Sequence, residues 1–335
     1  MFSRKNSPIL FKFLFLCIFS MLVYACSQQE EEQALTPKIE KSHFQDFLQE
    51  HTQRIAAQDL GEGRYRVEGE QGTIIDIENG LVNSAGERVR GNIEIELIEI
   101  YNVKDMILAR KQTLADYDGA KKVLESGGEV FVQPYQNGEA LKADGQGNIS
   151  IMLPTENTGG PRDNMELYYG EEIGEQVIWK PTGEKVPVIS NHLRSELSYY
   201  IVTLQNALGW INVDIIYEGD GEAIECIQLE VECRELCDIN TSYAAIYVNS
   251  LNSAFELTQI SPTSFELCDE MGSGISLGGV NVTFIVMIEC RDGSIQVAFV
   301  NATLTPGMHL QSISCDQLRF MDRPSYESEL SNLMR

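Results

Sequence analysis

Short runs in which apolar and polar residues alternate constrain this chain more than any other feature. In residues 92–97, Asn-Ile-Glu-Ile-Glu-Leu, the apolar side chains fall on one face of an extended strand and the glutamates on the other. Residues 129–133 and 148–153 repeat the pattern. The apolar positions change phase at Ile98 and Ile100, which predicts a β-bulge. Runs this short and this evenly spaced predict an all-β fold of the sandwich type.

One segment follows a helical period instead. Ser42 and Gln45 have the spacing of a helix capping box, and apolar residues then recur at helical intervals as far as Ile55. We therefore expect one short helix over residues 42–58, laid against the first of the β domains.

The first 25 residues have the composition of a secretory signal peptide. Arg4 and Lys5 precede an apolar run from Phe13 to Ala25, which is shorter than the roughly 20 residues that a membrane-spanning helix needs. The sequence Val-Tyr-Ala-Cys ending at Cys26 resembles the lipobox of bacterial lipoproteins. That resemblance implies an acylated Cys26 that anchors the chain to a lipid bilayer, since two or more acyl chains anchor stably. The alternative is an ordinary cleaved signal followed by a chance cysteine.

The residues after Cys26 are polar and acidic. Ser27 is followed by Gln-Gln and then by Glu30, Glu31 and Glu32, and three consecutive carboxylates must be solvated. This segment resembles the acidic signal that Bacteroidota place beside the lipidated cysteine to export lipoproteins to the outer face. The resemblance implies an outer-membrane lipoprotein at the cell surface. A plain solvated spacer, and a lipoprotein facing the periplasm, are the alternatives.

The charge balance excludes one class of partner. The chain has 50 acidic and 25 basic residues, a net charge of −25. A nucleic-acid-binding protein needs a basic surface to displace counterions from phosphates, so nucleic acid is excluded.

Several segments resemble the ZU5-type β-sandwich of Bacteroidota lipoproteins. The segments that carry the resemblance are Gly72–Val82, Gly91–Leu97, Asn102–Leu108 and Trp179 for the first domain, and Leu208–Asp214, Asn249–Ser253 and Glu327–Leu333 for the second. Leu208–Asp214 contains the Gly-Trp-Ile-Asn sequence that begins the second domain in those proteins. The resemblance covers about residues 70–335, and it implies a fold and a location without a substrate.

These observations together predict two β-sandwich domains, Ig-like or ZU5-like, after a lipidated tether and one short helix. The expected organisation is a signal peptide over 1–25, an acidic tether and short helix over 26–60, a ZU5-like β-sandwich over 61–190, and a cysteine-rich β-sandwich over 191–335.

Six cysteines are confined to the second of these domains. They are Cys226, Cys233, Cys237, Cys268, Cys290 and Cys315. An even, clustered number of cysteines in an exported protein indicates disulfides, whose connectivity the sequence leaves open. Buried free thiols and a thiolate zinc site opened by Cys233 and Cys237 are the alternatives. Two cysteines four apart in one strand are too distant to bridge each other, so a turn must separate them or each pairs elsewhere.

Two further features have a structural and a functional interpretation. Asp116-Tyr-Asp118-Gly119 and the Asp144 loop contain fragments of a calcium-binding loop, but turn chemistry explains them, and we expect no metal and no cofactor. An aromatic set is expected in the core or on strand faces, with a glycan-stacking surface as the alternative; its members are Trp179, Trp210, Tyr168, Tyr169, Tyr199 and Tyr200.

The sequence lacks the motifs of common catalytic sites. No Gly-x-Ser-x-Gly elbow, no His-Glu-x-x-His and no phosphate-binding glycine loop is present. We therefore expect a surface lipoprotein that is not an enzyme and acts as a binding or structural scaffold module for an unknown protein or glycan partner. The alternative is an extracytoplasmic hydrolase with an unrecognised carboxylate site.

Overall fold

The chain divides into two compact units, residues 1–42 and residues 43–335. The computed structural model describes residues of the second unit only, namely 43–117, 119–174, 176–190, 197–204, 207–269 and 274–333. The predicted signal peptide, Cys26 and the acidic tether lie outside the described residues.

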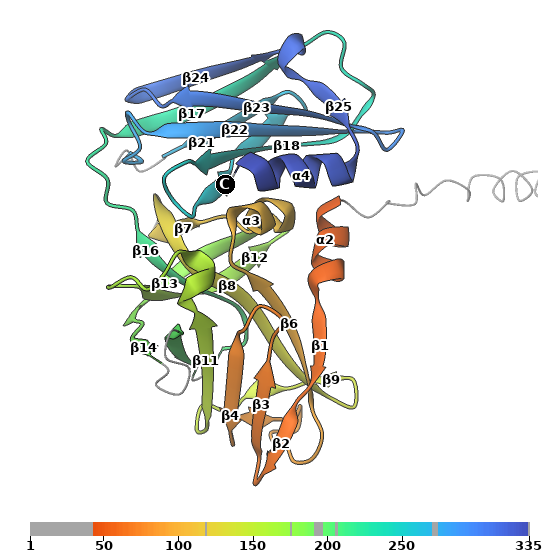
Figure 1. The fold of residues 1–335 in the computed structure, drawn as a ribbon, viewed down its shortest axis with the longest axis vertical. Helices are drawn as coiled ribbons and strands as arrows, with labels where there is room; N and C mark the ends of the chain where they lie inside the picture. The colour runs from red at the N-terminus through yellow and green to blue at the C-terminus, as the bar shows by residue number, and fades with distance from the viewer. Residues whose placement is uncertain are drawn as a thin grey trace, which may run out of the picture. The chain divides into compact units, whose positions relative to one another are not determined.

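The first half of this unit is built from two large sheets (Figure 1). Sheet A has the order β1 (Gln53–Ala56), β6 (Glu94–Ile100), β8 (Ala120–Gln136), β16 (Gly209–Ile216), β12 (Glu166–Ile173), β13 (Gln176–Lys185) and β7 (Leu114–Tyr117), with β9 (Glu139–Ala140) beside β8. Sheet B has the order β14 (Val188–Ser190), β15 (Ser198–Leu204), β11 (Asn148–Pro154), β4 (Ile74–Glu78), β3 (Arg64–Glu68) and β2 (Gln58–Gly61). A small pair joins β10 (Lys142–Ala143) to β5 (Leu81–Val82). We call sheets A and B the first sandwich.

The second half is built from two further sheets, which we call the second sandwich. Sheet D has the order β20 (Thr258–Ser261), β21 (Ser264–Cys268), β17 (Ile224–Glu232) and β24 (Gly307–Ser314). Sheet E has the order β19 (Ala254–Glu256), β18 (Ile239–Val248), β22 (Asn281–Cys290), β23 (Ile295–Thr303) and β25 (Arg319–Met321). The predicted all-β, multi-sheet fold is therefore confirmed.

Short helices accompany the sheets. The α-helices are α2 (His43–His51), α3 (Val103–Ala109) and α4 (Arg323–Leu333), and the 3-10 turns are η1 (Thr155–Thr158) and η2 (Cys315–Gln317). In the described part of the chain, no helix is long and apolar enough to cross a membrane.

The helix predicted over residues 42–58 is shorter in the structure. It ends at His51, and Ile55 lies in β1, opposite Ile95 of β6. The edge of β6 offers backbone partners to residues 53–56, and this pairing replaces the second half of the helix. The short helix itself packs its buried Phe47 against α3 and β6.

Three apolar clusters hold these layers together. One fills the first sandwich between sheets A and B, and includes Ile75 and Val213. Another fills the second sandwich between sheets D and E, and includes Leu229 and Phe284. The remaining cluster joins sheet A, sheet E and the three helices, so both faces of sheets A and E are covered by apolar side chains.

This double coverage explains why the predicted bulge at Ile98 and Ile100 is absent. The register of β6 against β8 runs without a shift from Glu94 to Ile100. Leu97 belongs to the cluster between sheets A and B, whereas Ile98 and Ile100 belong to the cluster that includes the helices. The apolar phase changes because β6 passes from one covered face to two.

The pairing of strands places the transition between the two sandwiches after residue 216. β15 pairs with β11 of sheet B, and β16 pairs with β8 and β12 of sheet A. The boundary expected near residue 190 therefore lies between two paired strands, β14 and β15, of the same sheet. The Gly-Trp-Ile-Asn segment lies in β16 of the first sandwich.

A loop of the second sandwich docks on the segment that follows α3. The Thr113 N–H donates to the Ala254 carbonyl at 2.8 Å, and the Thr113 hydroxyl lies 2.7 Å from that of Ser253. The side chain of Asn252 donates to the carbonyls of Tyr101 and Ser126 at 3.1 and 3.0 Å. Residues 249–253, one of the segments that carry the lipoprotein resemblance, thus lie at the contact between the two sandwiches.

Candidate functional site

The candidate site is the strand β24 at one edge of sheet D. It pairs in parallel with β17 on one side, and no strand within the described residues pairs with its other side (Figure 1). Its sequence, Gly-Met-His-Leu-Gln-Ser-Ile-Ser, contains no charged residue and no proline. Proteins usually protect an edge strand with lysines, prolines or a bulge, because its free N–H and C=O groups pair readily with another chain. β24 contains no lysine or proline, and the register shift in its pairing with β17 lies only at its start, opposite Gly307 and Met308.

The first half of the outer face of β24 is apolar. His309 and Ile313 point into the core, so the alternation of the strand turns Met308 and Leu310 outward. Met308 is 58% exposed and Leu310 is 67% exposed. They are two apart on one strand face and therefore form a continuous apolar strip beside the unpaired edge.

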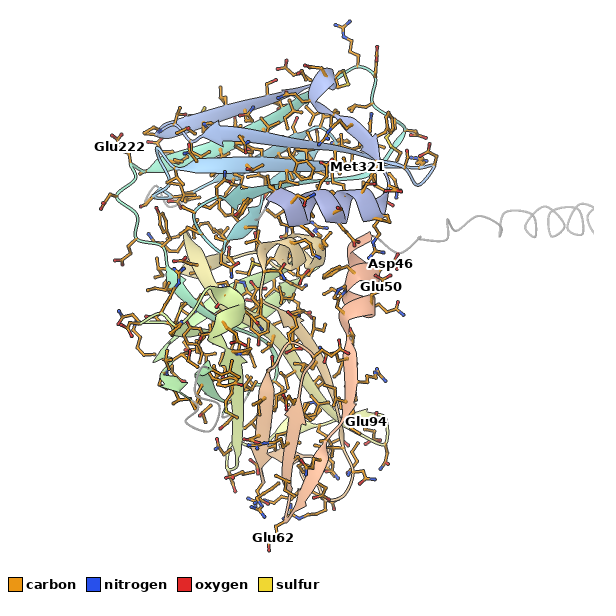
Figure 2. All side chains as sticks on the ribbon, viewed as in Figure 1. Asp46, Glu50, Glu62, Glu94, Glu222 and Met321 are labelled. Carbon is orange, nitrogen blue, oxygen red and sulfur yellow. A yellow bond between two sulfur atoms is a disulfide. The ribbon has the colours of Figure 1, made fainter. Side chains whose placement is uncertain are left out.

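The rest of sheet D carries only negative charge. β17 contains Glu225, Glu230 and Glu232, β21 contains Glu266, and the four strands of the sheet contain no lysine or arginine. Glu230 lies opposite Ser312 of β24 and accepts a hydrogen bond from Ser264 at 2.6 Å. Other glutamates project outward around the unit, as Glu62 and Glu222 do in Figure 2.

A buried histidine supports β24 from inside. The ring of His309 stacks on Phe284 with centroids 5.6 Å apart, and its Nδ1 accepts the N–H of Thr305 at 3.1 Å. Burial lowers the pKa of His309, because the charged ring would lose its water.

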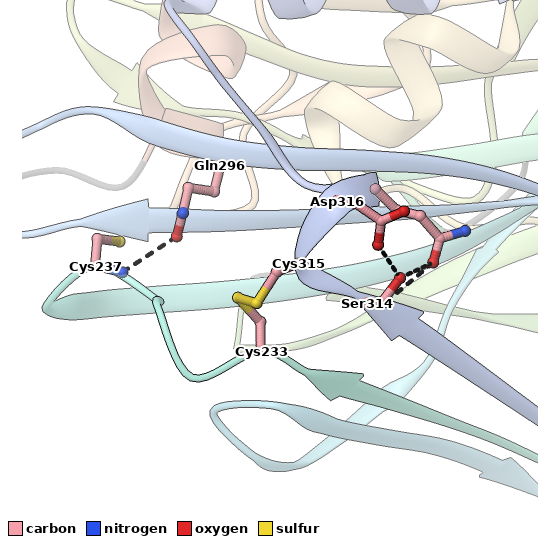
Figure 3. The surroundings of a disulfide bond; sticks show 7 residues. Cys233, Cys237, Gln296, Ser314, Cys315 and Asp316 are labelled. Carbon is pink, nitrogen blue, oxygen red and sulfur yellow. Dashed lines mark hydrogen bonds between the residues drawn. A yellow bond between two sulfur atoms is a disulfide. The ribbon is translucent and has the colours of Figure 1, made fainter.

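The six cysteines of this half form three disulfides, as predicted. The pairs are Cys226–Cys268, Cys233–Cys315 and Cys237–Cys290. Figure 3 shows the bond between Cys233, at the end of β17, and Cys315, in the 3-10 turn η2 after β24. Cys237 lies nearby, where its N–H donates to Gln296 at 3.2 Å. The bond at Cys315 therefore fixes the end of the candidate strand.

This pairing settles the alternatives for the cysteines. Cys233 and Cys237 lie between β17 and β18, and each bonds to a distant partner, so they do not open a zinc site. Cys226, Cys268 and Glu266 place ligand atoms within 4.8 Å of one another. Two of those atoms are sulfurs of one disulfide, and a metal ligand must be a thiolate.

The calcium-loop fragments act as turns. The carboxylate of Asp116 accepts the Gly119 N–H and lies 3.5 and 3.3 Å from the amines of Lys121 and Lys180, and these contacts lower its pKa. Asp144 accepts the N–H groups of Gln146 and Gly147, both at 2.8 Å. Asp118 lies outside the described residues.

The aromatic residues lie in the core rather than on a glycan-binding face. All but Tyr169 are buried: Trp179, Trp210, Tyr168, Tyr199 and Tyr200. The indole N–H of Trp179 donates to the Gln112 carbonyl, and the hydroxyl of Tyr168 meets that of Tyr117 at 2.8 Å. These polar tips have partners inside the protein, which is how buried tyrosine and tryptophan are normally satisfied.

A cluster of buried polar residues inside sheet A was not predicted from the sequence. Glu129 on β8 lies opposite Asn212 on β16, and Ser126 lies opposite Asp214, all fully or almost fully buried. Polar residues that alternate with apolar ones in a strand usually face water. Here the helices and the second sandwich cover that face of sheet A, so Asn212 and Asp214 are buried.

A surface pocket of about 450 Å³ opens at the end of β16. Its polar lining includes Glu125, Glu166, Glu218 and Lys185. Glu125 pairs with Arg162, and Glu166 pairs with Lys185 at 2.6 Å. Because Glu125 and Glu166 are already paired within the chain, we do not assign the site to this pocket.

Comparison with known proteins adds no identity. No family model and no curated protein matches the chain. Among solved structures, the gamma-CGTase from Alkalophilic bacillus clarkii matches 79% of this chain at 10% sequence identity and a TM-score of 0.20. The match spans 41% of that enzyme's chain. A likeness at this level carries no argument about fold or activity.

Proposed function

We propose that this chain is a lipid-anchored binding module of the outer membrane, exposed at the cell surface, which acts without catalysis. In this proposal the second sandwich binds an extended, basic segment of a partner protein, which adds as a strand to the free edge of β24. The observation that carries the proposal is the uncharged edge of β24 beside exposed Met308 and Leu310.

The chemistry of sheet D supports a protein segment as the occupant. An edge strand offers main-chain hydrogen bonds that an extended peptide can complete, and side chains beside that edge provide specificity. A peptide at β24 would place alternate side chains against Met308 and Leu310. Its long cationic side chains would reach toward Glu230 on the neighbouring strand, so the segment should combine apolar and basic residues.

The location rests on two supports. The Val-Tyr-Ala-Cys sequence before the acidic tether supports lipid anchoring and surface export. Three disulfides support an oxidising compartment outside the cytoplasm.

A displayed library of extended peptides tests the binding proposal. We expect selection on the wild-type protein to enrich peptides with alternating apolar and basic residues. The Leu310→Glu variant should bind these peptides at least about tenfold more weakly, because it puts a carboxylate at the strip.

Ile260→Glu is the matched control for that selection. Ile260 is 59% exposed on β20, at the opposite edge of the same sheet. The Ile260→Glu variant should bind the selected peptides as strongly as the wild type does. Equal loss of binding in both variants, or no enriched peptide at all, would reject β24 as the site.

A further inference from the structure

The side chains of Lys111, Glu129 and Asn212 meet on one buried face of sheet A. Trp210 and Asn212 are two apart on β16 and therefore point to the same face. Glu129 lies directly opposite Asn212 on β8, so its side chain shares that face. Lys111, in the segment after α3, lies over it, with its amine 4.9 Å from the centre of the Trp210 ring.

All three groups are removed from solvent. Lys111 is 3% exposed, and Glu129 and Asn212 are fully buried. Residues two apart on a strand are about 7 Å apart, a span that the lysine side chain covers by rotating from Trp210 toward Asn212. The structure thus brings an amine, a carboxamide and a carboxyl group together inside the protein.

The carboxyl group of Glu129 differs from that of Glu99, another buried carboxylate of this sheet. Glu99 accepts hydrogen bonds from Gln53, Gln71 and Thr73. Within the described residues, neither oxygen of Glu129 has a hydrogen-bond partner. Burial, and secondarily the charge of Asp214, raise the pKa of Glu129 well above its usual range. A protonated Glu129 can donate a proton, which an ordinary salt-bridged glutamate cannot do.

Asn212 is held in place for attack at its side chain. Its amide nitrogen donates to Asp214 at 2.5 Å, and the hydroxyl of Ser126 lies 3.4 Å from its amide oxygen. Holding two reacting groups at fixed positions lowers the entropic barrier of a reaction between them.

We propose that Lys111 and Asn212 are joined by an intramolecular isopeptide bond whose formation Glu129 assists. The neutral lysine amine attacks the side-chain carbonyl carbon of Asn212, and a new C–N bond forms. Glu129 protonates the carboxamide and receives the proton that the lysine nitrogen loses. The C–N bond to the amide nitrogen then breaks, and ammonia leaves. No oxidant, reductant or external cofactor is needed.

Burial supplies the protonation states that this step requires. Transfer of one proton from the ammonium to the carboxylate converts an ion pair into two neutral groups, and a dry environment favours neutral groups. The product would connect the segment that contacts the second sandwich, through Thr113, to the centre of sheet A. It would close a loop of about 100 residues and so restrict the unfolded chain, as a disulfide does.

Mass spectrometry of the reduced, alkylated and digested full chain tests the proposal. We expect a branched peptide that joins the segments of Lys111 and Asn212, with a mass lower than their sum by one ammonia. Trypsin should not cleave after Lys111. Lys111→Arg should abolish the branched peptide completely, whereas Lys104→Arg, a change on α3, should preserve it.

The molecule lost on bond formation, ammonia or water, shows whether the lysine amine attacked a carboxamide or a carboxyl group. Asn212→Asp should form the same bond with loss of water, and Glu129→Gln should leave the two segments separate in protein whose fold is verified by circular dichroism. If either variant fails to fold, the mass of the wild-type branched peptide alone tests the proposal. Wild-type peptides with a free Lys111 side chain would overturn the proposal. A deficit of water in the wild type would also overturn it, because the acceptor would then be a carboxylate.

Discussion

Arg110 and Glu256, 146 positions apart in the sequence, form an ion pair between the end of α3 and β19, in which Glu256 is buried and Arg110 is half-buried. The guanidinium also lies over the ring of Tyr243, 5.4 Å from its centre. The pair connects the two sandwiches through charges that are largely removed from water, where an ion pair interacts more strongly than at the surface.

Removing one partner of this pair should be costly. We expect Arg110→Ala to lower the free energy of unfolding by about 3 kcal/mol, because the buried carboxylate of Glu256 loses a cationic partner. Urea denaturation measures the loss. Arg54→Ala breaks the exposed pair with Glu96 and should cost less than about 1 kcal/mol. Similar losses in both variants would contradict a stronger interaction at the half-buried pair.

The disulfides should differ in their effect on stability. Removing the Cys233–Cys315 bond by double serine substitution should cost about 2–4 kcal/mol, because the bond restricts the unfolded chain. It spans 82 residues, and the Cys226–Cys268 bond spans 42. Doubling a loop changes its closure cost by about 0.6 kcal/mol, so the longer loop should lose more. Non-reducing denaturation of the two double variants measures the order, and the reverse order would contradict this reasoning.

Acid should weaken the second sandwich through His309. Because burial lowers its pKa in the folded state below that of the unfolded chain, the folded state binds fewer protons. Its contribution is fully present above the unfolded pKa, about 6.5, and is lost as the pH falls toward the folded pKa. The slope from this one group is at most about 1.4 kcal/mol per pH unit.

His309→Gln should therefore reduce the fall in unfolding free energy between about pH 7 and about pH 5. Ile260→Gln, at an exposed position of β20 and without a titratable group, serves as the control and should leave the pH dependence unchanged. An unaltered pH dependence in the His309→Gln variant would exclude this histidine as the cause.

Lipid attachment at Cys26 should be detectable directly. Metabolic labelling with a fatty-acid analogue should mark the wild-type protein and not Cys26→Ala, because the sulfur carries the acyl chains. Equal labelling of the two proteins would reject the lipobox interpretation.

Replacement of Glu30, Glu31 and Glu32 by alanine separates anchoring from export. The variant should keep its label, since acylation does not depend on these side chains. Protease added to intact cells should digest the wild type and spare the variant. Protection of the wild type itself would favour a lipoprotein that faces the periplasm.

Local alternation predicted the strands well where one face meets a core. Residues 92–97 and 148–153 form parts of β6 and β11, with Ile95 and Ile151 inside. It failed where a second layer covers the other face. The phase change at Ile98 then suggests a bulge that the structure lacks, because the second layer comes from segments far away in the sequence.

The candidate site depends on similar long-range information. The cysteine count predicted disulfides, yet the sequence left their connectivity open, and the fold alone brings Cys233 next to Cys315. From the sequence alone, Met308 and Leu310 have the spacing of two residues on one face of any β-strand. Their significance depends on β24 pairing on one side only, which no local pattern shows.

Hydrogen exchange of the full chain with a selected basic peptide tests the binding mode most directly. Strand addition predicts that the amides of residues 308–314 exchange more slowly when the peptide is bound, because the free edge gains main-chain hydrogen bonds. The amides of β20, at the opposite edge of sheet D, should be unchanged. Protection confined to β20 or to the first sandwich, or binding without any protection of β24, would contradict the account.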